Sequence, residues 1–145
     1  MRIYTRLEIG GIVDAGLVLS GGTYAHLPDR HVSFELAILG SDGHRRTRLA
    51  RVDWRDLKGG HSNNRGKCPG SIRRAPATHL HSFALNWDQQ KGRMKRGKLP
   101  CAEAISEDLQ TFEELRRYVG THFRINNIDI VPRPDWVYDL FNEAR

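Results

Sequence analysis

Two histidines separated by one residue are the first candidates for chemistry in this chain. His79-Leu80-His81 lies in a predicted strand over residues 78–87, so both imidazoles should project from one face with their Cβ atoms about 7 Å apart. That spacing suits an acid–base pair beside a phosphodiester bond, or two ligands of one metal ion. The same face continues into apolar residues, which also allows two inert histidines at the rim of the core. All three roles remain open at this point.

Other polar residues could complete a site around this pair. Asp53 ends a preceding predicted strand and could orient an imidazole or pair with an arginine, and His61 lies in a glycine-rich loop that could approach a ligand. A metal site would need such further ligands, with Cys68 also available, but no spacing matches a known zinc pattern. We therefore predict His79, His81, Asp53 and His61 as catalytic candidates, with no metal ion and no cofactor.

Positive charge is concentrated in the middle of the chain. Residues 44–98 contain 15 Lys and Arg against three acidic residues, whereas the whole chain has a net charge of +6. This segregation predicts an electropositive face that attracts a phosphate backbone or an acidic protein, the alternative being a solvated basic loop without a ligand. The predicted phosphate-binding residues flank the histidine strand and are Arg73, Arg74, Arg93, Lys95 and Arg96.

Composition bounds the class of protein. A chain of 145 residues with 39% hydrophobic residues fits a single domain, 1–145. No stretch approaches the roughly 20 apolar residues that cross a bilayer, and the N-terminus lacks a signal-peptide pattern. Cys68 and Cys101 lie in no CxxC pair, so reduced thiols in a cytoplasmic protein are expected. The Walker A, dinucleotide-binding, GxSxG and HExxH motifs are missing.

Hydrophobic periodicity predicts the strands that must position these residues. Residues 2–9 and 12–20 form one predicted hairpin across Gly10-Gly11, and residues 31–39 and 44–54 form a second. A long loop over 55–77 precedes the histidine strand, and a second basic loop over 91–98 follows it.

The last third of the chain is predicted to be helical. One helix begins after a Ser106 cap or at a capping box from Thr111 to Glu114, and ends at Gly120. Pro134 opens a final helix with Trp136, Val137, Leu140 and Phe141 turned inward. Strands first and helices last predict an α+β fold, with an antiparallel sheet of about five strands covered by C-terminal helices.

Three short motifs carry a resemblance to known proteins: Arg51-Val52-Asp53-Trp54, His61-Ser62-Asn63 and His79-Leu80-His81-Ser82-Phe83. They resemble a group of small bacterial proteins with an R-x-D strand, an H-x-N loop and an H-L-H-x-[FY] strand, similar to TumE-type proteins of toxin–antitoxin modules. The resemblance covers residues 31–130 and implies a gene of mobile-element or defence type. It also implies Asp53, His61, His79 and His81 as a shared polar set. The insert between the second and third motifs is longer and richer in arginine here.

The leading hypothesis is a toxin-like domain that binds RNA and cleaves it without a metal ion. His79 and His81 would act as general base and general acid, with Asp53 orienting one imidazole. An alternative is a non-catalytic inhibitor that blocks a nucleic-acid-guided defence complex through its basic face, and a third is a metal-dependent nuclease. The expected partner is nucleic acid or an acidic protein such as an antitoxin, and not a membrane. Exposure of the two histidines should separate the first two hypotheses.

Overall fold

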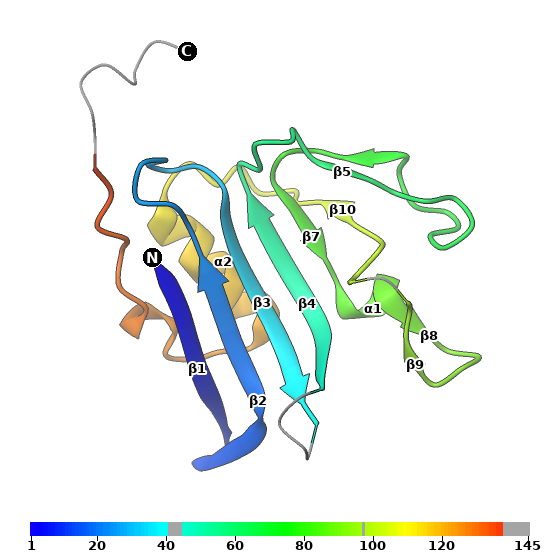
Figure 1. Ribbon diagram of the computed structural model, residues 1–145, viewed down its shortest axis with the longest axis horizontal. Coiled ribbons are helices and arrows are strands. Elements are labelled where there is room, and N and C mark those ends of the chain that lie inside the picture. The colour runs from blue at the N-terminus through cyan, green and yellow to red at the C-terminus, as the bar shows by residue number, and fades with distance from the viewer. Residues whose placement is uncertain (41–44, 97, 138–145) are drawn as a thin grey trace.

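The computed structural model of the protein describes residues 1–40, 45–96 and 98–137. Within these ranges, six strands form one antiparallel sheet in the order β1-β2-β3-β4-β7-β10 (Figure 1). The strands are β1 (Arg2–Ile9), β2 (Ile12–Gly22), β3 (Val32–Leu39), β4 (Arg46–Trp54), β7 (His79–His81) and β10 (Glu103–Ala104). The α+β class is therefore confirmed, with one more strand than expected.

Shorter elements extend the molecule beyond β7, on the side away from β1 (Figure 1). They include two small hairpins, β5 (His61–Ser62) with β6 (Arg74–Ala75) and β8 (Trp87–Asp88) with β9 (Arg93–Met94). The helices of the described residues are α1 (Phe83–Asn86), α2 (Phe112–Phe123) and the 3-10 turn η1 (Ile128–Ile130). None of them combines the length and apolar character that crossing a membrane requires.

Both predicted N-terminal hairpins are confirmed. Gly10 and Gly11 connect β1 to β2 with φ of 61° and 82°, a region that glycine adopts without the steric penalty of a Cβ atom. Strands β3 and β4 pair over most of their length, as the alternation of apolar residues predicted. The predicted turn between them falls largely on residues 41–44, which lie outside the described ranges.

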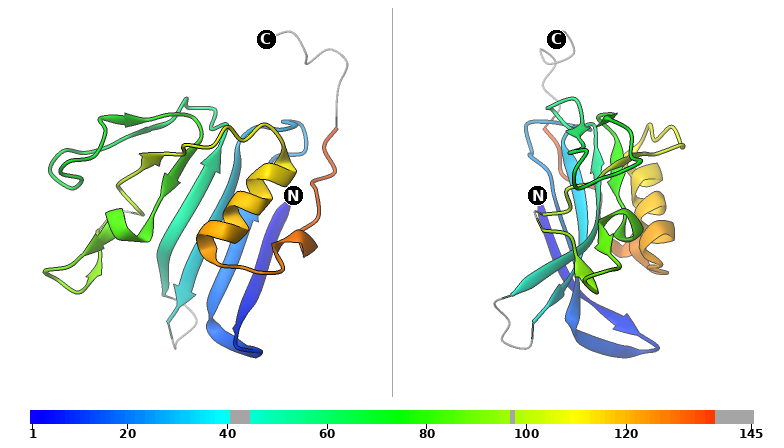
Figure 2. Two further views of the ribbon diagram at one scale, coloured as in Figure 1. Left: turned by 180° about the vertical axis from the view of Figure 1, so that it is seen from behind. Right: turned by 90° about the vertical axis from the view of Figure 1, so that its right-hand side faces the viewer.

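Alternation along the central strands gives the sheet two different faces. Val52 in β4 lies between Phe34 in β3 and Leu80 in β7, and all three are buried. These residues belong to the hydrophobic core together with the buried side of α2, and we call this the packed face. Figure 2 shows α2 on one side of the sheet only. The side chains of Arg51 and Asp53, which alternate with these residues, point to the other side, which we call the site face.

Helix α2 begins and ends for local reasons. The capping box predicted between Thr111 and Glu114 is present, because the Thr111 side chain accepts from Glu114 N and the Glu114 side chain accepts from the backbone of Thr111. The predicted end at Gly120 is wrong. A Cβ atom at position 120 would lie 2.5 Å from Cγ2 of Ile128, so the glycine permits close packing of η1 inside the helix rather than ending it. The chain leaves the helix at Arg124, in the left-handed conformation.

Two predicted elements differ from the structure. The strand expected over 78–87 ends at His81, because the Ser82 side chain caps α1 and turns Phe83 outward to 44% exposure. The apolar continuation of the histidine face is therefore wrong. The final helix expected from Pro134 is not formed over residues 132–137, and the rest of that prediction lies outside the described residues. Trp136 is nevertheless buried, edge-on against Phe112.

Candidate functional site

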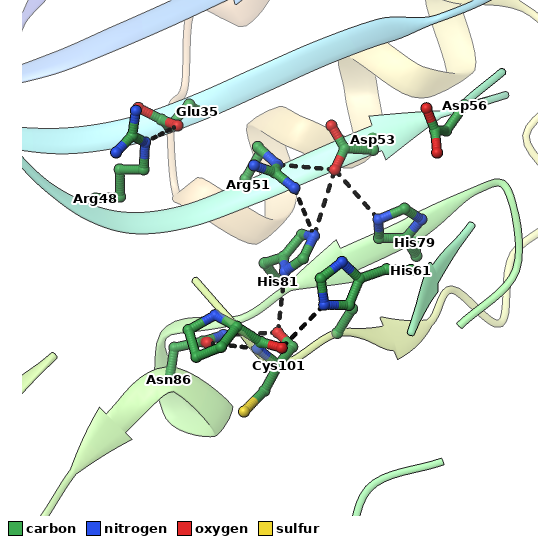
Figure 3. A network of polar contacts seen from close by, with 12 residues as sticks. Glu35, Arg48, Arg51, Asp53, Asp56, His61, His79, His81, Asn86 and Cys101 are labelled. Carbon is green, nitrogen blue, oxygen red and sulfur yellow. Dashed lines mark hydrogen bonds and ion pairs between the residues drawn. The ribbon is translucent and has the colours of Figure 1, made fainter. Parts of the chain in front are cut away.

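Three imidazoles and one carboxylate meet on the site face. His79 and His81 project from β7 beside Asp53 of β4, and the β5–β6 hairpin brings His61 against them (Figure 3). The ring centroids of His79 and His81 are 5.0 Å apart, and those of His61 and His81 are 4.7 Å apart. The structure thus brings together all four residues that the sequence singled out as catalytic candidates. We call these four residues the histidine cluster.

Asp53 is the hub of this cluster. Its Oδ2 accepts a hydrogen bond from Arg51 Nε at 2.7 Å and lies 3.2 Å from His79 Nε2 and 3.4 Å from His81 Nε2. Burial by itself would raise the pKa of the carboxyl, but the two histidines and the positive charge of Arg51 outweigh it and hold the pKa far below its usual range. Asp53 is therefore an anion, and it both pairs with an arginine and contacts the histidines.

Each histidine of the cluster uses one ring nitrogen on a backbone carbonyl. His61 Nε2 lies 2.9 Å from Pro100 O, His79 Nδ1 lies 2.8 Å from Pro76 O, and His81 Nδ1 lies 3.0 Å from Cys101 O. A carbonyl oxygen only accepts, so each of these nitrogens carries the proton. In a neutral ring the lone pair is then on the opposite nitrogen, which is Nδ1 of His61 and Nε2 of His79 and His81.

His81 lies deepest in the cluster. It is completely buried, and burial lowers its pKa against the opposing effect of Asp53. Arg51 Nη2 is 2.8 Å from His81 Nε2, so the neutral ring accepts a hydrogen bond from the guanidinium. The His81 ring therefore serves as a hydrogen-bond partner inside the cluster and is not exposed to a substrate.

Two buried asparagines hold the segment that orients His61 and His81. Asn86 bonds to both the N–H and the C=O of Cys101, at 2.9 and 2.8 Å. Asn63 bonds in the same two-sided way to Ala102, at 2.8 and 2.7 Å. We call residues 100–102 the strap. Position 63 belongs to the motif that contains His61, whereas nothing in the sequence indicated a role for Asn86.

Cys68 and Cys101 form a disulfide that joins the strap to the loop after β5. The expectation of two reduced thiols is wrong, because residues 33 positions apart in sequence are brought to a Cα–Cα distance of 5.5 Å. The disulfide anchors the same segment whose carbonyls orient His61 and His81. Since disulfides are uncommon in reducing compartments, the cytoplasmic location stays a prediction.

The cluster opens into a polar cavity of about 380 Å³ on the site face. Arg51, Asp53, His61 and His79 line one part of it, whereas His81 is behind this wall. The two predicted acid–base histidines thus differ: His79 borders the cavity although it is only 2% exposed, and His81 does not.

A second group on the cavity wall was missed by sequence reasoning. His31 Nδ1 lies 3.2 Å from Asp56 Oδ1, and the His31 ring stacks on Tyr24 with centroids 5.6 Å apart. These residues meet because β3 begins where β4 ends, and His31 N donates to Arg55 O just beyond the paired strands. The residues are 25 positions apart, and no motif spacing links them.

The five predicted phosphate-binding residues fall into two groups. Arg74 donates to Lys58 O at 3.0 Å, and Lys95 Nζ donates to Leu85 O at 2.7 Å, so both cations hold the local backbone. Arg73, Arg93 and Arg96 make up the second group and, like Arg74, are exposed. Sequence alone did not separate the two groups, because hydrogen bonds to backbone carbonyls depend on how the loops fold.

No protein-family model matches this sequence, and comparisons with curated proteins and with solved structures give no significant match. The resemblance to TumE-type proteins therefore stays a prediction that rests on its three short motifs.

Proposed function

We propose that this protein is a toxin-like domain that binds single-stranded RNA and cleaves it in the cavity of the site face. The observation that carries the proposal is a cavity that joins a buried arginine–aspartate–histidine cluster to a second, more accessible histidine–aspartate pair. Perturbed and mutually oriented titratable groups in a concave site are typical of active sites.

His31 is the general base in this proposal. Asp56 faces its Nδ1, which leaves Nε2 as the nitrogen that can take a proton from a substrate. The side chain of His31 is 37% exposed at the cavity, unlike the buried rings of His79 and His81. The base is therefore assigned to the accessible pair of His31 and Asp56.

The ribose 2′-hydroxyl is the proposed nucleophile. Its proton passes to His31 Nε2, its oxygen bonds to the adjacent phosphorus, and the P–O5′ bond breaks. The leaving oxygen takes a proton from water, the hydroxide that remains takes the proton from His31 Nε2, and the products are a 2′,3′-cyclic phosphate and a 5′-hydroxyl. Arg51 and Lys58 border the cavity and are placed to neutralise the phosphate oxygens.

Two surface features support RNA as the polyanion. Tyr24 is 53% exposed beside His31, which offers an aromatic face for an unpaired base. Three exposed cations of the predicted set, Arg73, Arg93 and Arg96, lie in the segments beyond β7, where a phosphate backbone could follow them.

Cleavage of end-labelled single-stranded RNA by purified protein tests the proposal. His31→Ala should slow cleavage by about 10²–10⁴-fold, the usual contribution of a general base. His122→Ala is a matched control, because His122 is an exposed histidine of α2 and is not among the residues that line the cavity. A substrate with 2′-deoxyribose at the cleaved position should be inert.

A different outcome would favour the non-catalytic inhibitor. In that case RNA or a protein complex would be bound without cleavage, charge reversal at Arg93 and Arg96 would abolish binding, and His31→Ala would change nothing. Intact RNA after prolonged incubation with folded protein, both with and without added divalent metal ions, would rule out the nuclease proposal.

A further inference from the structure

The histidine cluster has a feature that acid–base chemistry does not require. All three rings present a lone pair on the nitrogen opposite to the one bonded to a backbone carbonyl. One ring nitrogen from each of His61, His79 and His81 lies within 4.8 Å of one ring nitrogen from each of the other two. Metal-bound histidines almost always donate their second ring N–H to a carbonyl or carboxylate, which fixes the tautomer and turns the ring toward the ion.

The contacts of Asp53 are also typical of a metal-binding site. His79 Nε2 carries a lone pair in the neutral ring, yet it faces the anionic Oδ2 of Asp53 at 3.2 Å. Two facing lone pairs are unfavourable unless a cation lies between them, either a proton or a metal ion. In a tetrahedral zinc site with bonds of about 2.0–2.1 Å, neighbouring ligand atoms are about 3.3 Å apart. The separations of 3.2 and 3.4 Å from Asp53 Oδ2 to His79 and His81 match that spacing.

We propose that His61 Nδ1, His79 Nε2, His81 Nε2 and Asp53 Oδ2 form a binding site for one divalent transition-metal ion, with Zn²⁺ as the best fit. Three imidazoles and one carboxylate are a ligand set that zinc and its neighbours in the first transition row prefer over Mg²⁺ or Ca²⁺. The proposal replaces the expectation of a metal-free site.

Two adjustments accompany metal binding. His61 and His79 have the most distant ring centroids of the three pairs, at 6.0 Å, so the half-buried His61 moves inward on its short hairpin. Arg51 Nη2 donates to His81 Nε2 in this structure, so this group has to turn away before the nitrogen can bind an ion. Arg51 Nε keeps its bond to Asp53. The turned guanidinium then points its Nη2 toward the cavity, where it can contact a phosphate.

The role of this ion in catalysis rests on the proposed function, whereas its binding does not. Because four protein ligands would complete a tetrahedral site, the ion would act on the phosphate through its positive charge, which would stabilise the negative charge that develops as the P–O5′ bond breaks. It would give the cluster the positive charge that neutral imidazoles and an aspartate anion lack. The base remains His31, which is outside the ligand set.

The test is a titration of the full chain, stripped with chelator and dialysed, in the absence of RNA. Isothermal calorimetry with Zn²⁺ should give one ion per chain, and Co²⁺ should give the strong visible absorption of a tetrahedral site. His61→Gln should weaken Zn²⁺ binding by more than about 100-fold, since even outer-shell changes cost about 10–100-fold. His26→Gln is the matched control and should bind like the wild type.

Folding of each variant is checked by circular dichroism. His61 is half-buried on a hairpin outside the main sheet, so its substitution is the least disruptive of the three. His79→Gln is the second variant and should lose binding in the same way. If His61→Gln fails to fold, the His79→Gln variant and the Co²⁺ spectrum of the wild type test the metal site instead.

The two proposals can fail separately. Absence of stoichiometric Zn²⁺ binding, or equal binding by His61→Gln and His26→Gln, would overturn the metal site. Stoichiometric binding without RNA cleavage would keep the metal site and overturn the nuclease. Cleavage in chelator by a protein that binds no metal would keep the nuclease and overturn the ion.

Discussion

The two faces of strands β3, β4 and β7 are built from alternate residues of the same segments, yet they are held together differently. On the packed face, Phe34, Val52 and Leu80 lie in a core that α2 shares, and burial of apolar surface stabilises them without directional bonds. On the site face, Asp53 and His79 are also largely buried, but each depends on particular hydrogen-bond partners. The same pleat therefore produces a stabilising face and a chemical face.

The difference shows how a small domain can bury charge. An aspartate anion and three histidines would be costly in an apolar core, but nearly every ring nitrogen of the cluster faces a carbonyl, a carboxylate or a guanidinium. The strap, which the disulfide anchors, supplies two of these carbonyls. The site face is therefore completed by segments from outside the central strands. The packed face is covered by α2 and by residues on both sides of it, including Leu109.

The largest expected effect is on the packed face. Trp54 is completely buried and its Nε1 donates to Leu109 O at 2.8 Å. Trp54→Ala should lower the free energy of unfolding by about 5 kcal/mol, the upper end for such truncations, because it leaves a cavity and an unsatisfied carbonyl. Urea unfolding measures the loss. Trp87→Ala is the control, since Trp87 is only partly buried against Phe83, and an equal loss there would contradict the assignment of the core.

Breaking the disulfide should cost slightly less stability but should affect the site more. Cys68→Ser opens a loop with a sequence separation of 33, which corresponds to about 3–4 kcal/mol of unfolding free energy in the chain-entropy model. The strap should also lose its anchor, so Zn²⁺ affinity should fall. Urea unfolding and zinc titration under non-reducing conditions measure both effects. A wild-type protein whose stability and zinc affinity are unchanged by reductant would contradict this prediction.

Asp53→Asn separates charge from shape on the site face. The amide keeps the size of the side chain but removes the anion that faces Arg51 and His79, so unfolding free energy should fall by about 1–3 kcal/mol in the presence of chelator. Zn²⁺ binding should weaken as well. Asp88→Asn, in an exposed pair with Lys91, should leave both properties unchanged. Similar behaviour of the two variants would mean that the cluster is not a functional unit.

The smallest effect concerns the cap of α2. Thr111→Ala removes the side chain that accepts from Glu114 N, and should cost about 1 kcal/mol of stability without any change in metal binding. A loss of metal affinity in this variant would show that a change on the packed face alters the site face, which would contradict their independent stabilisation.

The same cap gives a pH dependence. The backbone N–H groups of Gln110 and Thr111 donate to Glu114 and lower its pKa. The contribution of the Glu114 carboxylate to the stability of the fold is therefore complete above its ordinary pKa of about 4.3. This contribution is lost as the pH falls through the lower pKa of the folded state. Thermal unfolding of Glu114→Gln should show a weaker loss of stability over that range than the wild type shows. Parallel curves would contradict the cap.

Prediction from sequence succeeded where local patterns decide the structure. The alternation in residues 44–54 predicted the strand that β4 forms over Arg46–Trp54. The capping box at Thr111, one of the two helix starts that the sequence allowed, is the start that α2 uses. It failed where a local signal competes with another one. A period of two residues extended the histidine strand to Trp87, whereas Ser82 starts a helix at that point.

The same reasoning predicted only part of the candidate site. Asp53, His61, His79 and His81 were chosen by residue type and motif, and they do lie together. Their hydrogen-bond partners at Pro76, Pro100 and Cys101 were not predicted, because backbone carbonyls carry no sequence signal. For the same reason nothing in the sequence joined His31 to Asp56.

The sequence by itself determined which residues share a face, because side-chain direction in a strand follows from position alone. It therefore determined that His79 and His81 lie side by side, and that Val52 and Asp53 point to opposite sides of the sheet. Only the tertiary structure decided which ring nitrogen of His61 and of His81 carries the proton, that Cys68 meets Cys101, and that His81 is hidden while His31 borders the cavity. Those properties depend on contacts between segments 20 to 40 positions apart, whose separations follow from packing and not from spacing along the chain.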